Sequence, residues 1–322
     1  MKKWFIVLMA LMLCMLMGTA FAEAYKIENR TLYVIDYLND LPEGDYDSIC
    51  VNKGGTLELD ISAEVSKNVT NYGIIQGGTF KGDVTNYEYI KGGTFFGTVL
   101  SNNRGRIEGG TFHAAVNSRE NCKIQGGTFT VTSEVSNVLR SEITGGEFSG
   151  KVFNGNTGIG GREGIISGGI FTKTSEVTNG RKGIIKDGAT FYGKLYYLIV
   201  IKTSEFKNSS TVIASVDGTN ANKAMEKETV CLTVAPEANY ELGTLTVTSE
   251  DGSDIALSKV GNSDYRFTMP ASVIYVTASF NECTKIPVLP ETGDPSAPTL
   301  WLSMSILSMA GVLLLRKKAY SR

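Results

Sequence analysis

The middle of the chain is built from a short repeat, and the length of that repeat restricts the folds open to it. The unit Ile-x-Gly-Gly-Thr-Phe occurs at Ile75–Phe80, Ile90–Phe95, Ile107–Phe112 and Ile124–Phe129. Weaker copies end at Phe148, Phe171 and Phe191. A unit this short cannot hold a pair of helices, whereas its glycines and β-branched residues suit one coil of a β-solenoid.

The residues after each phenylalanine alternate between two faces. Phe80, Gly82 and Val84 fall on one side of an expected strand, and Lys81 and Asp83 fall on the other. Such a strand is half buried, and the large-small-large order lets opposite walls interdigitate. We therefore expect stacked coils with a buried phenylalanine column, a valine column and glycine bends at the corners.

An asparagine follows a valine by two residues in five of the units, at Asn71, Asn86, Asn137, Asn154 and Asn179. Asparagine tolerates left-handed backbone at a turn and can hydrogen-bond its copy in the next coil. We interpret these residues as a turn ladder and not as ligands. Hairpins in an antiparallel array are the alternative, but the period and the absence of proline between Pro42 and Pro236 favour parallel stacking.

The predicted fold class is therefore all-β. Residues 60–195 form a parallel β-helix, and residues 23–59 form its N-terminal cap, which covers an otherwise exposed sheet edge. Larger β-helix surface proteins, which this part of the chain resembles, imply a right-handed coil. Two coils place valine six residues after phenylalanine instead of four, at Val135 and Val177. The glycine-rich stretch between Asn154 and Gly164 is expected to be a loop.

Residues 1–22 have the pattern of a secretory signal peptide. Lys2 and Lys3 precede an apolar stretch, and Ala20-Phe21-Ala22 supplies the small residues of a cleavage site after Ala22. The mature chain is therefore expected to begin at about Glu23 and to be secreted.

The other end of the chain combines three elements in order. Leu289-Pro290-Glu291-Thr292-Gly293 is followed by an apolar run, Leu300–Leu315, and then by Arg316-Lys317-Lys318. The apolar run is shorter than the roughly 20 residues of a full span, but the cations after it can hold its end inside a membrane. An ordinary tail anchor behind a chance pentapeptide is the alternative.

This arrangement, over residues 289–322, resembles the sorting signal of Gram-positive surface proteins that sortase anchors to the cell wall. The resemblance implies that a sortase cysteine attacks the Thr292 carbonyl, that Gly293 leaves, and that Thr292 is joined to peptidoglycan. The implied partners are sortase and peptidoglycan, with transient membrane contact through the sorting signal. The implied location is the cell wall of a Gram-positive bacterium.

A second domain is expected from about Tyr196, where the glycine repeat stops. Its segments alternate as strands bounded by turn residues. Their order resembles the internalin-type B-repeat of bacterial surface proteins, above all at Phe267-Thr268-Met269-Pro270-Ala271. The resemblance implies a β-rich spacer over residues 196–281 without catalytic residues. Residues 282–288 then link it to the sorting motif.

Composition excludes several kinds of partner. The net charge of −2, without a basic block outside the targeting segments, excludes nucleic acid. No cofactor motif or metal-ligand spacing occurs, so we expect neither a cofactor nor a metal. Of the four cysteines after the signal, Cys231 and Cys283 flank the second domain and are a candidate disulfide, although simple unpaired cysteines are the favoured interpretation.

Two functions remain open. Many β-helix proteins are polysaccharide lyases or hydrolases, which need carboxylates grouped on adjacent coils. Glu142, Glu147 and Glu163 are the best acidic group, but a solvated face is the favoured interpretation, and His113, the only histidine, is isolated. We therefore expect no catalytic residue and no enzyme. We predict an adhesin or binding protein for a host or environmental glycan or protein, with a wall-anchored enzyme as the alternative.

Three tyrosines and one loop are the features that would mark a binding surface. Exposed Tyr72, Tyr87 and Tyr89 would favour binding over catalysis. The irregular loop between Asn154 and Gly164 is the expected contact region, because it interrupts a regular wall and loops on regular scaffolds often carry function.

Overall fold

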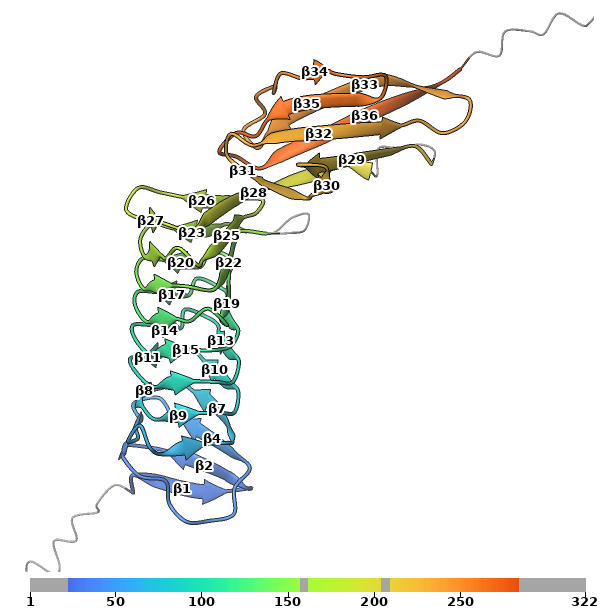
Figure 1. The fold of residues 1–322 in the computed structure, drawn as a ribbon. Coiled ribbons are helices and arrows are strands. Elements are labelled where there is room, and N and C mark those ends of the chain that lie inside the picture. The colour runs from blue at the N-terminus through green and yellow to red at the C-terminus, as the bar shows by residue number, and fades with distance from the viewer. Residues whose placement is uncertain (1–22, 157–161, 204–208, 284–322) are drawn as a thin grey trace, which may run out of the picture.

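The structure, a computed structural model, describes residues 23–156, 162–203 and 209–283. This part of the chain is all-β, with no α-helix. It forms a long solenoid of stacked parallel strands, with a second β domain at the C-terminal end of the stack (Figure 1). The predicted parallel β-helix is therefore confirmed.

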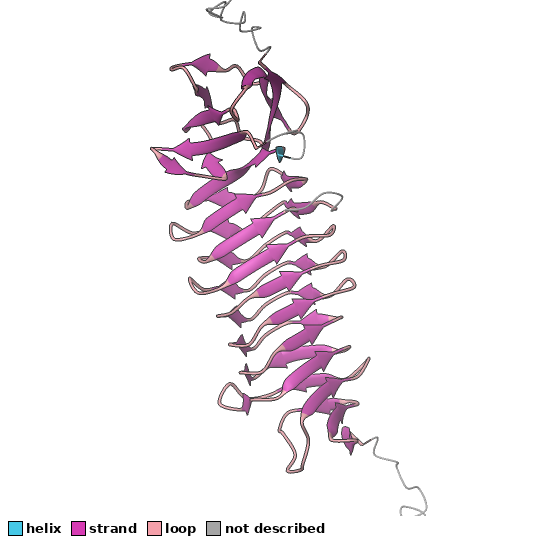
Figure 2. Cartoon of the chain, turned by 90° about the vertical axis from the view of Figure 1, so that its right-hand side faces the viewer, coloured by secondary structure: helices cyan, strands magenta, loops and turns pink. Residues whose placement is uncertain are grey.

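Each turn of the solenoid contributes a strand to up to three sheets, whose strands stack in rows (Figure 2). Sheet A contains β2 (Thr31–Val34), β4 (Ser48–Val51), β7 (Asn68–Asn71), β10 (Val84–Asn86), β13 (Val99–Ser101), β16 (Val116–Ser118), β19 (Glu134–Asn137), β22 (Lys151–Asn154), β25 (Glu176–Asn179) and β28 (Lys194–Ile201). Sheet B contains β3 (Tyr37–Leu38), β5 (Thr56–Glu58), β8 (Ile74–Gly77), β11 (Tyr89–Ile90), β14 (Arg106–Ile107), β17 (Lys123–Ile124), β20 (Glu142–Ile143), β23 (Gly164–Ile166) and β26 (Gly183–Ile185). Sheet C contains β6 (Glu64–Val65), β9 (Thr79–Phe80), β12 (Thr94–Phe95), β15 (Thr111–Phe112), β18 (Thr128–Phe129), β21 (Glu147–Phe148), β24 (Ile170–Phe171) and β27 (Thr190–Phe191).

The interior consists of one apolar column from each sheet. The phenylalanines of sheet C stack with ring centroids 4.4–4.9 Å apart, from Phe80 to Phe191. Sheet A contributes the valines, and sheet B contributes a column of isoleucines that includes Ile75 and Ile107. Val135 and Val177 stay in the valine column, because turns absorb the extra residues of their coils. Both predicted columns are therefore confirmed.

The corners bear out the glycine prediction and correct part of the asparagine prediction. In the Gly-Gly pairs between Gly77 and Gly169, the second glycine is left-handed, as at Gly110 with φ +105°, a conformation that favours glycine. Asn71 Nδ2 donates to Asn86 Oδ1 at 2.7 Å, so the asparagines do form a ladder. They are buried at strand ends, however, and their backbone is not left-handed. Burial favours a hydrogen bond for each amide. Ser101 and Ser118 interrupt the ladder between Asn86 and Asn137, and Asn137 Oδ1 has no hydrogen-bond partner among the described residues.

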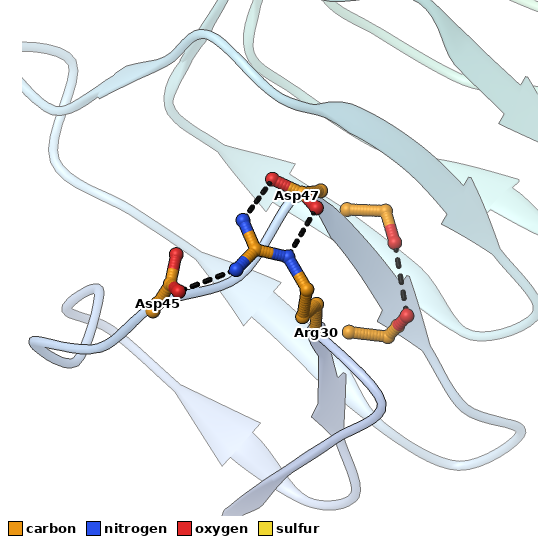
Figure 3. A network of polar contacts seen from close by, with 5 residues as sticks. Arg30, Asp45 and Asp47 are labelled. Atoms are coloured by element: carbon orange, nitrogen blue, oxygen red, sulfur yellow. Dashed lines mark hydrogen bonds and ion pairs between the residues drawn. The ribbon is translucent and has the colours of Figure 1, made fainter.

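An antiparallel strand, β1 (Tyr25–Glu28), covers the first edge of sheet A. Arg30, in the turn after β1, donates from Nε and Nη2 to Asp47 at 2.6 and 2.9 Å and from Nη1 to Asp45 (Figure 3). These bonds hold the pKa of Asp47 below its ordinary value. The cap expected over residues 23–59 is smaller than predicted, because the strands between Thr31 and Glu58 already stack in parallel as coils of the solenoid. Only β1 caps the stack, and the acidic turn is tied to the β1–β2 hairpin.

The second domain packs two layers of strands around its own core. A five-stranded sheet contains β30 (Thr219–Asn220), β29 (Thr211–Val216), β32 (Thr229–Ala235), β35 (Asp264–Thr268) and β34 (Ser258–Lys259). The other layer contains β31 (Lys223–Met225), β33 (Tyr240–Ser249) and β36 (Ile274–Glu282) and continues sheet A. Phe267 and Met269, from the segment that resembles the B-repeat, are buried in this core.

The expected boundary between residues 195 and 196 falls inside a strand. The first half of β28 pairs in parallel with β25, at Lys194 to Tyr197. Its second half pairs in parallel with β36, at Ile199 to Ile201. One strand therefore belongs to both the solenoid and the second domain.

Candidate binding groove

A groove of about 480 Å³ lies on the outer face of sheet A, next to the second domain. The second domain projects over the side of the solenoid that carries β19 and β22 (Figure 1). The groove is lined by Ala115, Asn117, Glu134, Val135, Ser136, Lys151, Val152, Phe153, Glu176, Thr178 and Lys223. Its volume lies within the range of about 300–1,000 Å³ that is usual for ligand sites.

The parallel register places the lining side chains in two straight columns. One column contains neutral groups in the order Asn117, Ser136, Phe153, Thr178. These residues face outward because they alternate with the buried valine and asparagine columns along each strand. The side chains of Asn117 and Ser136 make no hydrogen bond with any other described residue. Their polar atoms are therefore available to a ligand.

The second column alternates in charge. Glu134, Lys151, Glu176 and Lys194 occupy successive strands in register. Lys151 Nζ lies 3.2 Å from Glu134, and Lys194 Nζ lies 3.9 Å from Glu176. Three of these side chains are largely exposed and that of Glu176 is 40% exposed, so each pair adds little to stability. The pairing does neutralise the two carboxylates that border the groove.

Lys223, on β31 of the second domain, borders the groove at the end nearest that domain. Its Nζ donates to Thr178 Oγ1 at 3.3 Å and lies 4.3 Å from the centre of the Tyr196 ring. A cation over a tyrosine face is attracted by the ring electrons. The groove is therefore built by both domains.

A polar cluster ties the turn between β25 and β26 to the second domain. Arg181 Nε donates to the Tyr275 hydroxyl at 3.1 Å, and the Lys182 amide donates to Glu250 Oε1 at 2.6 Å. Burial raises the pKa of Tyr275, so its hydroxyl stays protonated at neutral pH. These bonds stabilise the arrangement that brings Lys223 over sheet A.

The three acidic residues singled out in the sequence do not form one site. Glu142 is on sheet B and Glu147 is on sheet C, whereas Glu163 precedes β23. Glu142 Oε1 accepts a hydrogen bond from Ser167 Oγ at 2.7 Å, and Glu142 Oε2 forms an ion pair with Lys123 Nζ at 3.2 Å. The Ser167 bond, followed by that lysine, lowers the pKa of Glu142. No group of three histidine, cysteine or acidic side chains suited to a metal occurs in the described ranges.

Of the three predicted aromatic residues, Tyr72 is exposed, Tyr87 and Tyr89 are half-buried, and none of them lines this groove. The rings of Tyr72 and Tyr87 stack with their centroids 4.8 Å apart. Lys91 Nζ and Arg106 Cζ each lie 5.7 Å from the centre of the Tyr89 ring. His113 stacks on the exposed Phe96 at 4.6 Å, on the outer face of sheet C, as its expected outward position requires. A groove of about 500 Å³ between sheets B and C is lined mostly by glycine and threonine. It offers hydroxyls but no charge.

The sequence interpretation missed Phe153 and Lys223. The same alternation that places Phe80 inside places Phe153 outside, so Phe153 could have been recognised as an aromatic side chain on a polar wall. Lys223 has no comparable signal, because its position depends on the packing of a second domain. The expected contact loop between Asn154 and Gly164 lies mostly at residues 157–161, outside the described residues.

The candidate disulfide between Cys231 and Cys283 is not formed, because all four described cysteines are free. Cys231 is on β32, where Ser215 and Arg266 are its strand neighbours, whereas Cys283 follows β36 in the other layer. Cys122 is buried and donates to the Arg119 carbonyl at 2.6 Å, and burial raises the pKa of its thiol. The favoured interpretation, unpaired cysteines, agrees with the structure.

The residues of the two targeting signals lie outside the described part of the chain. These are Ala22 and Leu289, Pro290, Glu291, Thr292 and Gly293. Among residues 23–156, 162–203 and 209–283, the structure has no helix that could cross a membrane. Comparisons of the chain with family models, curated proteins and solved structures find no match.

Proposed function

We propose that the chain is a cell-wall-anchored surface protein that binds a ligand on its solenoid and does not catalyse a reaction. The anchor is the sorting signal of residues 289–322, with Thr292 joined to peptidoglycan by sortase. The second domain acts as a short stalk, because it stands between the solenoid and that signal in the chain. The solenoid is then the part displayed away from the wall.

The observation that carries the binding role is the arrangement of Glu134, Lys151 and Glu176 in the groove. Two carboxylates on opposite sides of a glycosidic bond are needed for hydrolysis. Here the lysine occupies the strand between them and is ion-paired at 3.2 Å with Glu134. A sugar oxygen would have to take the place of that ammonium group. Neighbouring neutral groups instead offer a surface for recognition.

The anchoring half of the proposal is tested by changing Thr292 to Ala in the full chain and fractionating the cells. We expect the protein to leave the wall fraction and to appear in the membrane or the medium. Glu291→Ala is the matched control, because the resemblance assigns no fixed residue to that position, and it should remain in the wall. A Thr292→Ala protein that still needs a peptidoglycan hydrolase for its release would contradict the assignment.

The alternative, a glycan-cleaving enzyme, has one observation in its favour. Glu134 and Glu176 line the same groove two strands apart, or roughly 9.6 Å at a spacing of about 4.8 Å per strand. Inverting glycosidases hold their carboxylates about 6.5–9.5 Å apart, so the spacing of these two strands lies just beyond the upper limit of that range. Incubating the protein with host and plant glycans, and measuring both retention and new reducing ends, separates the two functions. Turnover that is lost in Glu134→Gln or Glu176→Gln would establish the enzyme.

A further inference from the structure

The groove on sheet A has two different ends. Toward the N-terminus its lining stops at Ala115 and Asn117, while the flat wall of sheet A continues through earlier strands. Toward the C-terminus, Lys223 bonds to Thr178 and covers Tyr196, the next residue of the same column. A linear ligand that lies along the groove therefore meets an end wall at Lys223. This shape suits the terminus of a linear molecule better than its middle.

The neutral column matches the chemistry of a sugar chain. Asn117 offers an amide, Ser136 offers a hydroxyl, and Phe153 offers a half-buried ring between Ser136 and Thr178. A pyranose needs hydrogen-bond partners for its hydroxyls and an apolar surface for its C–H face. Three strand steps separate Asn117 from Thr178, or roughly 14 Å, which is room for a short oligosaccharide.

The charges of the groove leave one cation without a counter-charge. Glu134 pairs with Lys151, and Glu176 has Lys194 beside it. Among the described residues no carboxylate forms an ion pair with Lys223, whose contacts are Thr178 and the Tyr196 ring. An anionic group at the end wall would pair with this ammonium, and a hydrogen bond to a charged group is stronger than one between neutral groups.

We propose that this groove binds the end of a glycan chain whose terminal sugar carries a carboxylate. The carboxylate pairs with Lys223, the ring of a sugar lies against Phe153, and Ser136 and Asn117 bond the hydroxyls that follow. This inference rests on the proposed binding function and adds a ligand class and an orientation to it.

The test uses cells that display the full chain and surfaces coated with paired glycans. Each pair consists of a glycan that ends in an acidic sugar and the same glycan with its terminal carboxyl reduced to the alcohol. We expect at least about ten-fold stronger adhesion to the acidic form, the factor that corresponds to the lower end of a charged hydrogen bond. Equal adhesion to both forms, or no adhesion to either, would overturn the proposal.

Two variants and two matched controls locate the site. Lys223→Gln should remove the preference for the acidic form, and Phe153→Ala should weaken adhesion to both forms about ten-fold. Lys91→Gln is the control for the first, because Lys91 also lies over a tyrosine ring but on sheet B. Phe96→Ala is the control for the second, because Phe96 is exposed on sheet C. Unchanged preference in Lys223→Gln, or equal losses in the controls, would place the site elsewhere.

Two further measurements keep this proposal distinct from the proposed function. Antibody staining of intact cells reports display, so a chain that is not anchored is recognised at once. Such a chain is collected from the medium, immobilised, and tested on the same glycan pairs. New reducing ends in the bound glycan would show that the protein is an enzyme and would overturn the proposed function. The effect of Lys223→Gln on the preference for the acidic form would still decide whether the acidic end of the glycan lies at Lys223.

Discussion

The phenylalanine column makes a quantitative prediction about stability. Phe112 is fully buried and stacks at 4.8 Å on Phe95 and at 4.8 Å on Phe129. Removing its ring loses the transfer free energy and leaves a cavity, which together cost about 3–5 kcal/mol for a core phenylalanine. The two stacked contacts, about 0.5–1.5 kcal/mol each, favour the upper half of that range. We therefore expect Phe112→Ala to lower the free energy of unfolding by about 4–5 kcal/mol.

Two other positions in sheet C calibrate this value. Phe191 ends the column, is only partly buried, and stacks on Phe171 alone, at 4.6 Å. Phe191→Ala should therefore cost less, about 2 kcal/mol. His113 adjoins Phe112 in the chain but faces outward. His113→Ala should cost under about 1 kcal/mol, as most surface substitutions do.

Urea denaturation of the mature chain, followed by circular dichroism, measures the three changes. The slope of the unfolding free energy against urea must be equal in all variants before the values are compared. Losses of similar size at Phe112 and His113 would refute the assignment of the two faces. A larger loss at Phe191 than at Phe112 would refute the stacking argument.

Three further predictions concern the corners and the pH dependence. Gly126→Ala places a methyl group against a backbone oxygen and should lower the free energy of unfolding by about 1–3 kcal/mol. Gly261→Ala, the control, meets only a flexible side chain and should change it little. Thermal unfolding of the two variants measures the difference. Asn154→Ala removes a buried amide bonded to both neighbouring coils and should cost about 1–3 kcal/mol, whereas Asn117→Ala, without such bonds, should not change urea stability. Because the pKa of Glu142 is lower in the folded protein than its ordinary value of 4.5, its ionised carboxylate stabilises the fold above about pH 4.5. This stabilisation is lost as the pH falls through the pKa of Glu142 in the folded protein. Glu142→Gln should flatten that part of the acid denaturation curve, and an unchanged curve would contradict the assignment.

The interior of the solenoid was predictable because a single rule repeats along the chain. Strand side chains alternate with a period of two, and parallel stacking places equivalent residues above one another. Phe80 and Val84 therefore identify two of the three inner columns from sequence alone. The asparagine ladder was predicted for a partly wrong reason, since burial, and not a left-handed turn, explains residues such as Asn86.

The groove was only half predictable. The alternation identifies Ser136 and Phe153 as outward residues, and register makes them neighbours. The ion pair of Lys151 with Glu134 also follows from register, although the sequence interpretation considered only the two glutamates. Nothing in a local pattern shows that Lys223, 45 residues after Thr178, returns to the same wall.

The position of Lys223 depends on β28, the strand inside which the domain boundary predicted from the sequence falls. A change in repeat pattern at Tyr196 suggests a boundary, and a boundary suggests a hinge. In the structure, β28 pairs with β25 on the solenoid and with β36 in the second domain, without interruption. Rotating one domain against the other would break backbone hydrogen bonds on this strand and the bond from Lys182 to Glu250. The end wall of the groove is therefore held by strand register, so a ligand bound there would meet a preformed site and would not have to order two domains on binding.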